Sequence, residues 1–211
     1  ELRELDGLCA AQGIELSANQ NTFGHMERWL RHPAYRSRAE APEGWRTRRG
    51  QHREPAVLAP TPENARFALE LCRNQLACVS SRRVNIGCDE TLELGRGRSR
   101  DAVAARGRGA VYLEHLRRIA EPLVEEGCQV LFWGDVLRQH PELLPRLPRD
   151  QVVALVWHYE APLDPDRLPP GLRQVAAELG FDTGSLRGFE TQLAPFAEAD
   201  RPFWVCPGTS T

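Results

Sequence analysis

The stretch Val84-Asn85-Ile86-Gly87-Cys88-Asp89-Glu90-Thr91 decides the fold, because in it a short apolar run ends in two adjacent carboxylates. In a strand, one face would carry Val84, Ile86 and Cys88, and the other face would carry Asn85, Gly87 and Asp89. A strand with one apolar face and one polar or empty face is typical of the wall of a barrel that is functional near its mouth. The chain turns after this strand, so Glu90 can leave the alternation and both acids can lie at the rim.

Strand and helix patterns alternate on both sides of this stretch. Strand patterns occur at 14–19, 129–135, 152–159 and 203–206, and helical patterns at 1–11, 61–78, 110–126, 137–144, 170–179 and 186–197. This alternation predicts a parallel sheet with crossover helices. Residues 31–62, rich in Pro and Arg, are predicted to form a long loop insertion, with Trp29 and Trp45 as its packing residues. An Arg- and Gly-rich solvated loop is predicted at 95–109, with contact to an acidic glycan or a phosphate as the alternative for its arginines.

The ends of these strands favour a closed barrel over an open doubly wound sheet. Polar or aromatic residues follow strand after strand: Asn19, Asp89-Glu90, Trp133 with Asp135, Trp157-His158-Tyr159 and Trp204. Site residues gathered at the C-terminal ends of many strands are typical of a (β/α)8 TIM-type barrel. No complete G-x-G-x-x-G fingerprint follows a strand. A whole barrel takes about 250 residues, so we expect residues 1–211 to form one catalytic barrel domain, incomplete and truncated at both ends, with about strands 3 to 7 present.

The composition argues against several classes of function. The chain has 211 residues, 27 basic residues that are all Arg, 29 acidic residues and a formal charge of −2, which does not suggest a nucleic-acid partner. It has no apolar run of about 18 residues, so no membrane span is expected. None of the six cysteines forms a C-x-x-C pair, and most lie in apolar runs, so a disulfide framework or zinc site is not expected. The cysteines favour a reducing compartment. Neither a metal site nor a cofactor is predicted.

Several motifs, taken in order, resemble those of glycoside hydrolase family 20, the β-N-acetylhexosaminidases. The family's strand-4 motif, His/Asn-x-Gly-Gly-Asp-Glu, is matched by Asn85-Ile86-Gly87-Cys88-Asp89-Glu90, with Cys88 in place of the second glycine. The Gly-His pair that ends strand 3 of the family is matched by Gly24-His25, and the tryptophans that end strands 5 and 6 by Trp133 and Trp157. The stretches 23–27 and 207–210 resemble a divergent, often intracellular branch, which implies a cytoplasmic location. The family's sugar-binding Arg on strand 1 and its strand-8 residues fall outside this chain.

The resemblance implies that terminal β-linked N-acetylhexosamine (GlcNAc or GalNAc) is removed from a glycan or glycoconjugate. In the family the 2-acetamido oxygen of the substrate attacks the anomeric carbon, and no protein nucleophile is used. Glu90 would then be the general acid and base, and Asp89 would orient the acetamide and stabilise the oxazolinium. Neighbouring carboxylates suit this role better than flanking one bond from opposite sides.

Five further residues are candidates for substrate binding. Trp133 and Trp157 would wall the pocket with flat aromatic faces, although either could be a core residue. Asp135 could bind a sugar hydroxyl or an Arg, or cap the next helix. Tyr159 could donate to the acetamide oxygen, although the family places that Tyr on a later strand. His25 could hydrogen-bond a sugar, orient Glu90 or only pack in its loop.

Two other interpretations of the acidic pair remain open. The chain could belong to a barrel glycosidase that acts on another glycan, or to a non-catalytic carbohydrate-binding barrel, since intact acids do not prove turnover. The sequence chooses neither between glucosaminide and galactosaminide nor between oligomeric states.

Overall fold

A computed structural model describes residues 1–47, 50–159, 169–178 and 188–208. The helices are α1 (Leu2–Ala11), α2 (Glu27–Leu30), α3 (Pro33–Arg36), α4 (Pro62–Leu76), α5 (Arg100–Arg106), α6 (Arg108–Glu125), α7 (Asp135–Arg138), the 3-10 helix η1 (Pro141–Arg146), α8 (Pro170–Glu178) and α9 (Phe189–Glu198). The strands are β1 (Ala18–Asn19), β2 (Trp45–Arg46), β3 (His52–Arg53), β4 (Arg83–Asn85), β5 (Gln129–Trp133), β6 (Val152–His158) and β7 (Phe203–Pro207).

Five of the seven described strands form a parallel sheet in the order β1-β4-β5-β6-β7, the same order in which they occur in the chain. Each described connection between neighbouring strands carries helix, as the alternation of patterns predicted. This arrangement is that of an incomplete (β/α)8 barrel, and the predicted fold class is confirmed. Parts of three predicted segments lie outside the described residues: position 179 of the helix predicted at 170–179, positions 186–187 of the helix predicted at 186–197, and positions 209–210 of the motif stretch 207–210.

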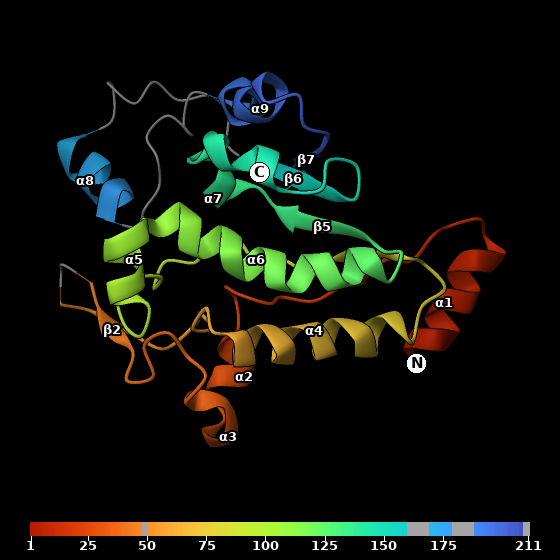
Figure 1. Ribbon diagram of the computed structural model, residues 1–211, viewed down its shortest axis with the longest axis horizontal. Coiled ribbons are helices and arrows are strands. Elements are labelled where there is room, and N and C mark those ends of the chain that lie inside the picture. Colours follow the sequence, from red (N-terminus) through yellow and green to blue (C-terminus); the bar gives the residue numbers. More distant parts are fainter. Residues whose placement is uncertain (48–49, 160–168, 179–187, 209–211) are drawn as a thin grey trace.

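The main core lies between the sheet and the long helices α4 and α6, which run side by side in Figure 1. Helix α4 begins at a cap in which the Thr61 hydroxyl accepts the Asn64 backbone N–H at 3.2 Å, with Pro62 in the first turn. Helix α6 buries an apolar stripe that includes Tyr112, Leu116 and Ile119.

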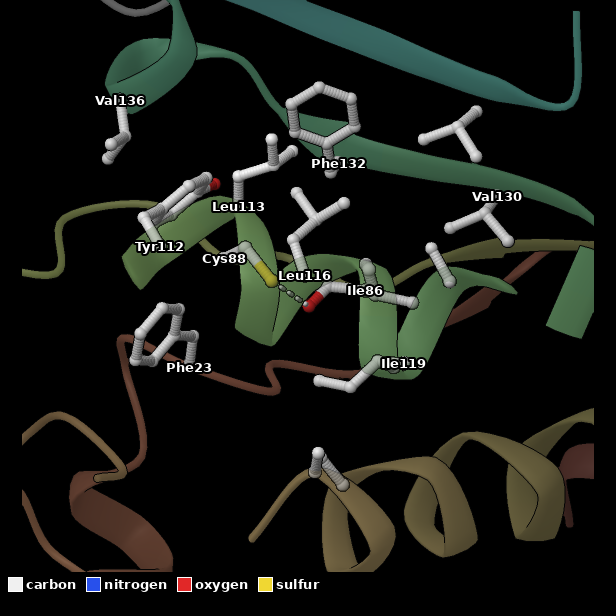
Figure 2. Packing of buried hydrophobic residues seen from close by; sticks show 14 of the residues in the cluster. Phe23, Ile86, Cys88, Tyr112, Leu113, Leu116, Ile119, Val130, Phe132 and Val136 are labelled. Carbon is white, nitrogen blue, oxygen red and sulfur yellow. Dashed lines mark hydrogen bonds between the residues drawn. The ribbon is translucent and has the colours of Figure 1, made fainter. Parts of the chain in front are cut away.

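The strand that precedes the acidic pair packs its apolar side against this helix layer. Val84, Ile86 and Cys88 are completely buried, as the alternation predicted. Figure 2 shows Ile86 and Cys88 among side chains of α6 and of β5, and its dashed line marks the contact of the Cys88 thiol with the Ile86 carbonyl. The opposite face of the sheet carries a smaller cluster formed by Leu131, Val153 and Leu155 with Trp133 and Cys206.

Two loop predictions differ from the structure. Within 95–109, residues Arg100–Arg106 form α5, and Arg108 already begins α6. The run Asp101–Ala105 favours a helix more than the surrounding Arg and Gly suggested. Residues 31–62 were expected to be irregular, but they contain α3, the antiparallel hairpin β2–β3 and a bridge between Ala39 and Leu58.

Candidate active site

The two acids leave the end of β4 through a left-handed turn. The φ angles are 68° at Gly87, 70° at Cys88 and 47° at Glu90. The Asn85 side-chain oxygen accepts the Gly87 N–H at 2.9 Å and fixes the start of the turn. Because left-handed residues break the alternation of a strand, Asp89 and Glu90 both reach the rim at the C-terminal end of the sheet.

The loop after β1 lies directly against this turn. A Cβ atom on Gly24 would lie 2.0 Å from the Asp89 carbonyl oxygen, so only glycine permits this approach. The next residue, His25, has a φ of 55° and places its Nε2 atom 3.3 Å from Asp89 Oδ2 and 3.5 Å from Glu90 Oε2. One imidazole therefore contacts both carboxylates.

The electrostatics of the pair favour a protonated imidazole. The hydrogen bond to Asp89 raises the pKa of His25 to about 9, with further increases from the charges of Asp89 and Glu90 and with burial acting in the opposite direction. His25 therefore carries a positive charge at neutral pH and offsets part of the repulsion between the two acids.

Asp135, directly after β5 and Gly134, supports the turn from the other side. Its Oδ2 atom accepts the Glu90 backbone N–H at 3.1 Å. Burial raises the pKa of Asp135 to about 7, and the charge of Asp89 raises it further. The buried Oδ1 atoms of Asp135 and Asp89 and the hydroxyl of Tyr112 have no hydrogen-bond partner among the described residues. Asp135 thus holds the backbone of Glu90 in place.

A pocket of about 800 Å³ opens in front of Glu90. It is bordered by the ends of the strands, the hairpin β2–β3, the start of α6, helix α7 and helix α9. Its lining includes His25, Glu27, Trp45, Arg53, Glu54, Glu90, Glu93, Arg108, Asp135, Arg138, Trp157, His158, Gln192 and Phe196. This volume suits a ligand of one or a few sugar units.

The structure brings four of the seven predicted site residues to this pocket: His25, Glu90, Asp135 and Trp157. Asp89 contacts His25 next to the pocket without belonging to its lining. Trp133 belongs to the small apolar cluster on the sheet face opposite α4 and α6, which is the inner face of the incomplete barrel, and it is not part of the pocket lining. Tyr159 is also outside it, is 53% exposed and packs on Trp157 with a ring-centroid distance of 5.3 Å.

Most of the lining residues were not among the predicted site residues, and three of them bear on the chemistry of the pocket. Trp45, predicted to pack within its loop, reaches the pocket from β2, and the Arg96 guanidinium lies 4.3 Å from the centre of its ring. Arg108, predicted to lie in a solvated loop, lines the pocket from the start of α6. Glu93 is buried, and its Oε1 atom accepts the Ala56 N–H at 2.7 Å. The Arg-rich composition of the two loops was the available signal, but it did not indicate which arginine turns inward.

The described part of the chain contains no group of three or more His, Cys, Asp or Glu residues placed to hold a metal ion. Among the described helices, none has the length and apolar character needed to cross a bilayer.

Comparisons with known proteins agree with the site described above. No family model matches the chain. Hexosaminidase D of Homo sapiens is 27% identical over 180 residues, which is 78% of this chain and 34% of that protein. Hexosaminidase D of Bos taurus is 28% identical over 175 residues, which is 78% of this chain and 47% of that protein. The chain thus spans between a third and a half of the length of these curated relatives.

Solved structures share the fold at lower identity. The β-N-acetylhexosaminidase of Bacteroides fragilis superimposes with a TM-score of 0.62 at 17% identity, over 96% of this chain and 34% of that one. The GH20 β-N-acetylhexosaminidase of Streptomyces coelicolor gives a TM-score of 0.55 at 16% identity, over 98% of this chain and 33% of that one. Together with the curated relatives, these structures confirm the resemblance to glycoside hydrolase family 20 and the incomplete barrel.

Proposed function

We propose that the protein containing this chain is a family 20 glycoside hydrolase that removes terminal β-linked N-acetylhexosamine with retention of configuration. Residues 1–211 contribute part of its catalytic barrel, and residues 31–62 form an insertion that walls the pocket. One observation carries the proposal: adjacent carboxylates of Asp89 and Glu90 share the Nε2 atom of His25, at 3.3 and 3.5 Å, beside a pocket large enough for a sugar.

The arrangement of the two acids favours assistance by the substrate. A retaining glycosidase with a protein nucleophile needs two carboxyls about 5–5.5 Å apart on opposite sides of the bond. Asp89 and Glu90 instead approach one imidazole nitrogen from consecutive positions in the chain. Such a pair can act on two atoms of the same sugar, the glycosidic oxygen and the acetamide nitrogen.

In the first step, the acetamide oxygen forms a bond to the anomeric carbon while the glycosidic C–O bond breaks. Glu90 donates its proton to the departing oxygen, and Asp89 accepts a hydrogen bond from the acetamide N–H as positive charge develops on the oxazolinium. In the second step, Glu90 takes a proton from water. The water oxygen attacks the anomeric carbon, and the bond from that carbon to the acetamide oxygen breaks, which opens the oxazolinium ring.

Each remaining lining residue from the prediction has a supporting role in this proposal. Trp157 offers an aromatic face to the sugar, and protonated His25 orients both carboxylates. Asp135 holds the backbone of Glu90 through the 3.1 Å hydrogen bond. Trp133 and Tyr159 remain candidates for contact with the substrate.

We also propose a cytoplasmic location for the protein. The six cysteines are all free thiols in the structure, and three of them are buried. Free thiols of this number suit a reducing compartment.

The test uses the complete reading frame and two kinds of substrate. Glu90→Gln should lower kcat at least about 100-fold on an unactivated N-acetyl-β-hexosaminide. The loss should be smaller on a nitrophenyl glycoside, because its leaving group needs little protonation. Asp89→Asn should lower kcat on both substrates, and Glu142→Gln, an exposed change on η1, should change neither rate. An N-acetyl thiazoline mimic of the oxazolinium should inhibit strongly.

Other results would redirect the assignment. Hydrolysis that is insensitive to the thiazoline would indicate a glycosidase that uses the pair differently. Sugar binding that is unaffected by Glu90→Ala, without any hydrolysis, would indicate a carbohydrate-binding barrel. Comparing glucosaminide with galactosaminide ranks the two sugars in the same assay.

A further inference from the structure

Arg108 is an arginine in an unfavourable electrostatic position. It is the first residue of α6, is half-buried and lines the pocket in front of Glu90. One terminal nitrogen donates to the Thr91 carbonyl oxygen at 2.7 Å, next to the acidic pair. Within the described residues, this is the single hydrogen bond of a guanidinium that has five N–H groups.

Three features of the surroundings oppose a positive charge at this position. Burial lowers the pKa of Arg108 and the charge of Arg96 lowers it as well, while the charge of the nearby Asp135 acts in the opposite direction. The N-terminal end of an 18-residue helix carries the positive end of the helix dipole, which repels a cation. Among the described residues, no carboxylate lies within ion-pair distance of Arg108. Elsewhere in the same part of the chain, arginines such as Arg73 and Arg118 pair with glutamates.

The neighbouring wall of the pocket adds to the positive charge. Arg53 reaches the pocket from β3, and Arg96 stacks on the lining residue Trp45. In the described residues neither arginine forms an ion pair. Glu54, on the same hairpin, is neutralised by Arg36 at 2.8 Å. The wall formed by Trp45, Arg53 and Arg108 therefore presents two arginines without an ion pair among the described residues and one aromatic face, although Glu27 and Glu93 also line the pocket.

We propose that this wall binds an oxyanion carried by the aglycone, the part of the substrate that leaves when the glycosidic bond breaks. The position of Arg108 supports this choice, because its hydrogen-bond acceptor Thr91 directly follows Glu90, and Glu90 protonates the oxygen that joins the aglycone to the sugar. A carboxylate, sulfate or phosphate would supply the acceptors that the free guanidinium N–H groups lack. The proposal rests on the proposed function and specifies the substrate class as acidic glycoconjugates.

The experiment compares matched substrates in the complete protein. One pair is N-acetylhexosamine β-linked to a uronic acid and to its neutral uronamide. A second pair carries a sulfate ester or a free hydroxyl on the same aglycone sugar, and a third carries a phosphate ester. Wild-type kcat/KM should favour the charged member of at least one pair about 10-fold or more. The pair with the largest ratio identifies the oxyanion.

Variants then link the preference to Arg108. Arg108→Met should bring the ratio of charged to neutral substrate close to one, and Arg108→Lys should retain part of it. Arg100→Met removes an exposed arginine on α5 that donates to the Arg96 carbonyl oxygen and does not line the pocket, and it should leave the ratio unchanged. Added inorganic sulfate should raise KM for the charged substrate of the wild-type protein more than for the neutral one.

The outcomes separate the two proposals. Hydrolysis of neutral substrates without a preference for charge, or a preference that survives Arg108→Met, would overturn the oxyanion site and leave the proposed function standing. Absence of hydrolysis of every N-acetylhexosaminide would overturn the proposed function itself. The sulfate competition uses the wild-type protein, so it decides the matter even if the Arg108 variants fold poorly.

Discussion

The turn at 87–90, here called the acidic turn, carries the two acids on a strained backbone. Cys88 is a non-glycine residue with a φ of 70°, at the position where the family motif has glycine. Its thiol is fully buried and lies 3.2 Å from the Thr22 hydroxyl, so packing compensates for the strained conformation. This explains both why glycine is usual here and why cysteine is tolerated.

Substitutions at position 88 should separate strain from packing. Cys88→Gly removes the strain and loses the buried thiol, so the free energy of unfolding should change by no more than about 1 kcal/mol. Cys88→Val keeps a positive φ with a β-branched side chain and should be at least about 2 kcal/mol less stable than Cys88→Gly. Urea unfolding of the complete protein measures both. Equal stability of the two variants would show that the turn is not strained.

Gly24 should control activity without touching substrate. The Cβ of Gly24→Ala would lie 2.0 Å from the Asp89 carbonyl oxygen, so the loop and the acidic turn must separate. Displacement of the acids by about 1 Å should lower kcat/KM by about 100-fold. Gly7→Ala in α1 is the matched control, since its Cβ meets no atom within 4 Å, and it should leave kcat/KM unchanged. Normal activity of Gly24→Ala would mean that the loop is adaptable.

Much of the site at this scale was predictable from the sequence. The resemblance to the family's strand-4 motif indicated Asp89 and Glu90, and the match to its Gly-His pair indicated His25, which the structure places against both acids. Arg108 could not be predicted, because its inward orientation depends on where α6 begins, and the Arg-rich composition around it resembles an exposed loop.

At the scale of elements, buried glutamates attach the long insertion to the acidic turn and to α5. Glu40 is fully buried and accepts hydrogen bonds from the Ser99 hydroxyl at 2.7 Å and from the Gly97 N–H at 3.0 Å. Glu93 binds the Ala56 N–H after the hairpin. These contacts hold the hairpin β2–β3 over the pocket and so place Trp45 in its lining.

Glu93 should make stability depend on pH. Burial raises its pKa to about 7, above the ordinary value of 4.5 for a glutamate. The folded state therefore binds more protons than the unfolded state between these values, so stability falls as pH rises from about 4.5 through 7. The full loss is about 3 kcal/mol. Glu93→Gln should reduce the fall relative to wild type in urea unfolding at a series of pH values.

Other shifted groups contribute to the remaining pH dependence. Asp135, whose pKa burial raises to about 7, acts in the same direction as Glu93 and should keep part of the slope in Glu93→Gln. His25, with a pKa raised to about 9, lowers stability as pH rises from about 6.5 to 9, whereas His115, whose pKa burial lowers to about 4, acts in the opposite direction between about 4 and 6.5. Glu142→Gln, on the surface, should leave the wild-type slope unchanged. An identical slope in Glu93→Gln and wild type would contradict the assignment of the burial effect to Glu93.

The elements were predictable where periodicity was strong. Strands β5 and β6 and helices α4 and α6 follow their apolar patterns closely. Helix α5 and the hairpin β2–β3 were missed, because short segments rich in Arg have no periodic apolar face, and tethers such as Glu40 come from distant parts of the sequence.

At the scale of the whole molecule, the sheet has an exposed strand on one side. Within the described residues β7 pairs with β6 alone, and it carries Trp204 at 42% and Val205 at 50% exposure. Helix α1 adds the exposed Leu8 at 67%. Such an edge and such apolar side chains favour association with other chains unless further protein covers them.

The 211-residue chain expressed alone should therefore self-associate. Val205→Arg, which places a charge on the exposed edge strand, should shift the population toward monomer in sedimentation velocity. Arg100→Met, away from the edge, should not. A monomeric wild-type chain at micromolar concentration would show that the edge is already protected.

The parallel architecture followed from the alternation of patterns, and the choice of a barrel followed from the polar residues at the strand ends. The pocket was not predictable, because its walls come from the insertion, α6, α7 and α9, and their packing depends on the whole sheet.

The agreement between strand order in the sheet and strand order in the chain has a consequence for biosynthesis. As the protein leaves the ribosome, each of the strands β4, β5, β6 and β7 finds a hydrogen-bonding partner already made, so the sheet can grow in one direction without waiting for distant segments. The acids and His25 emerge early, whereas the lining residues Gln192 and Phe196 of α9 emerge late. We therefore expect nascent chains released before α9 to have the acidic turn but not the closed pocket.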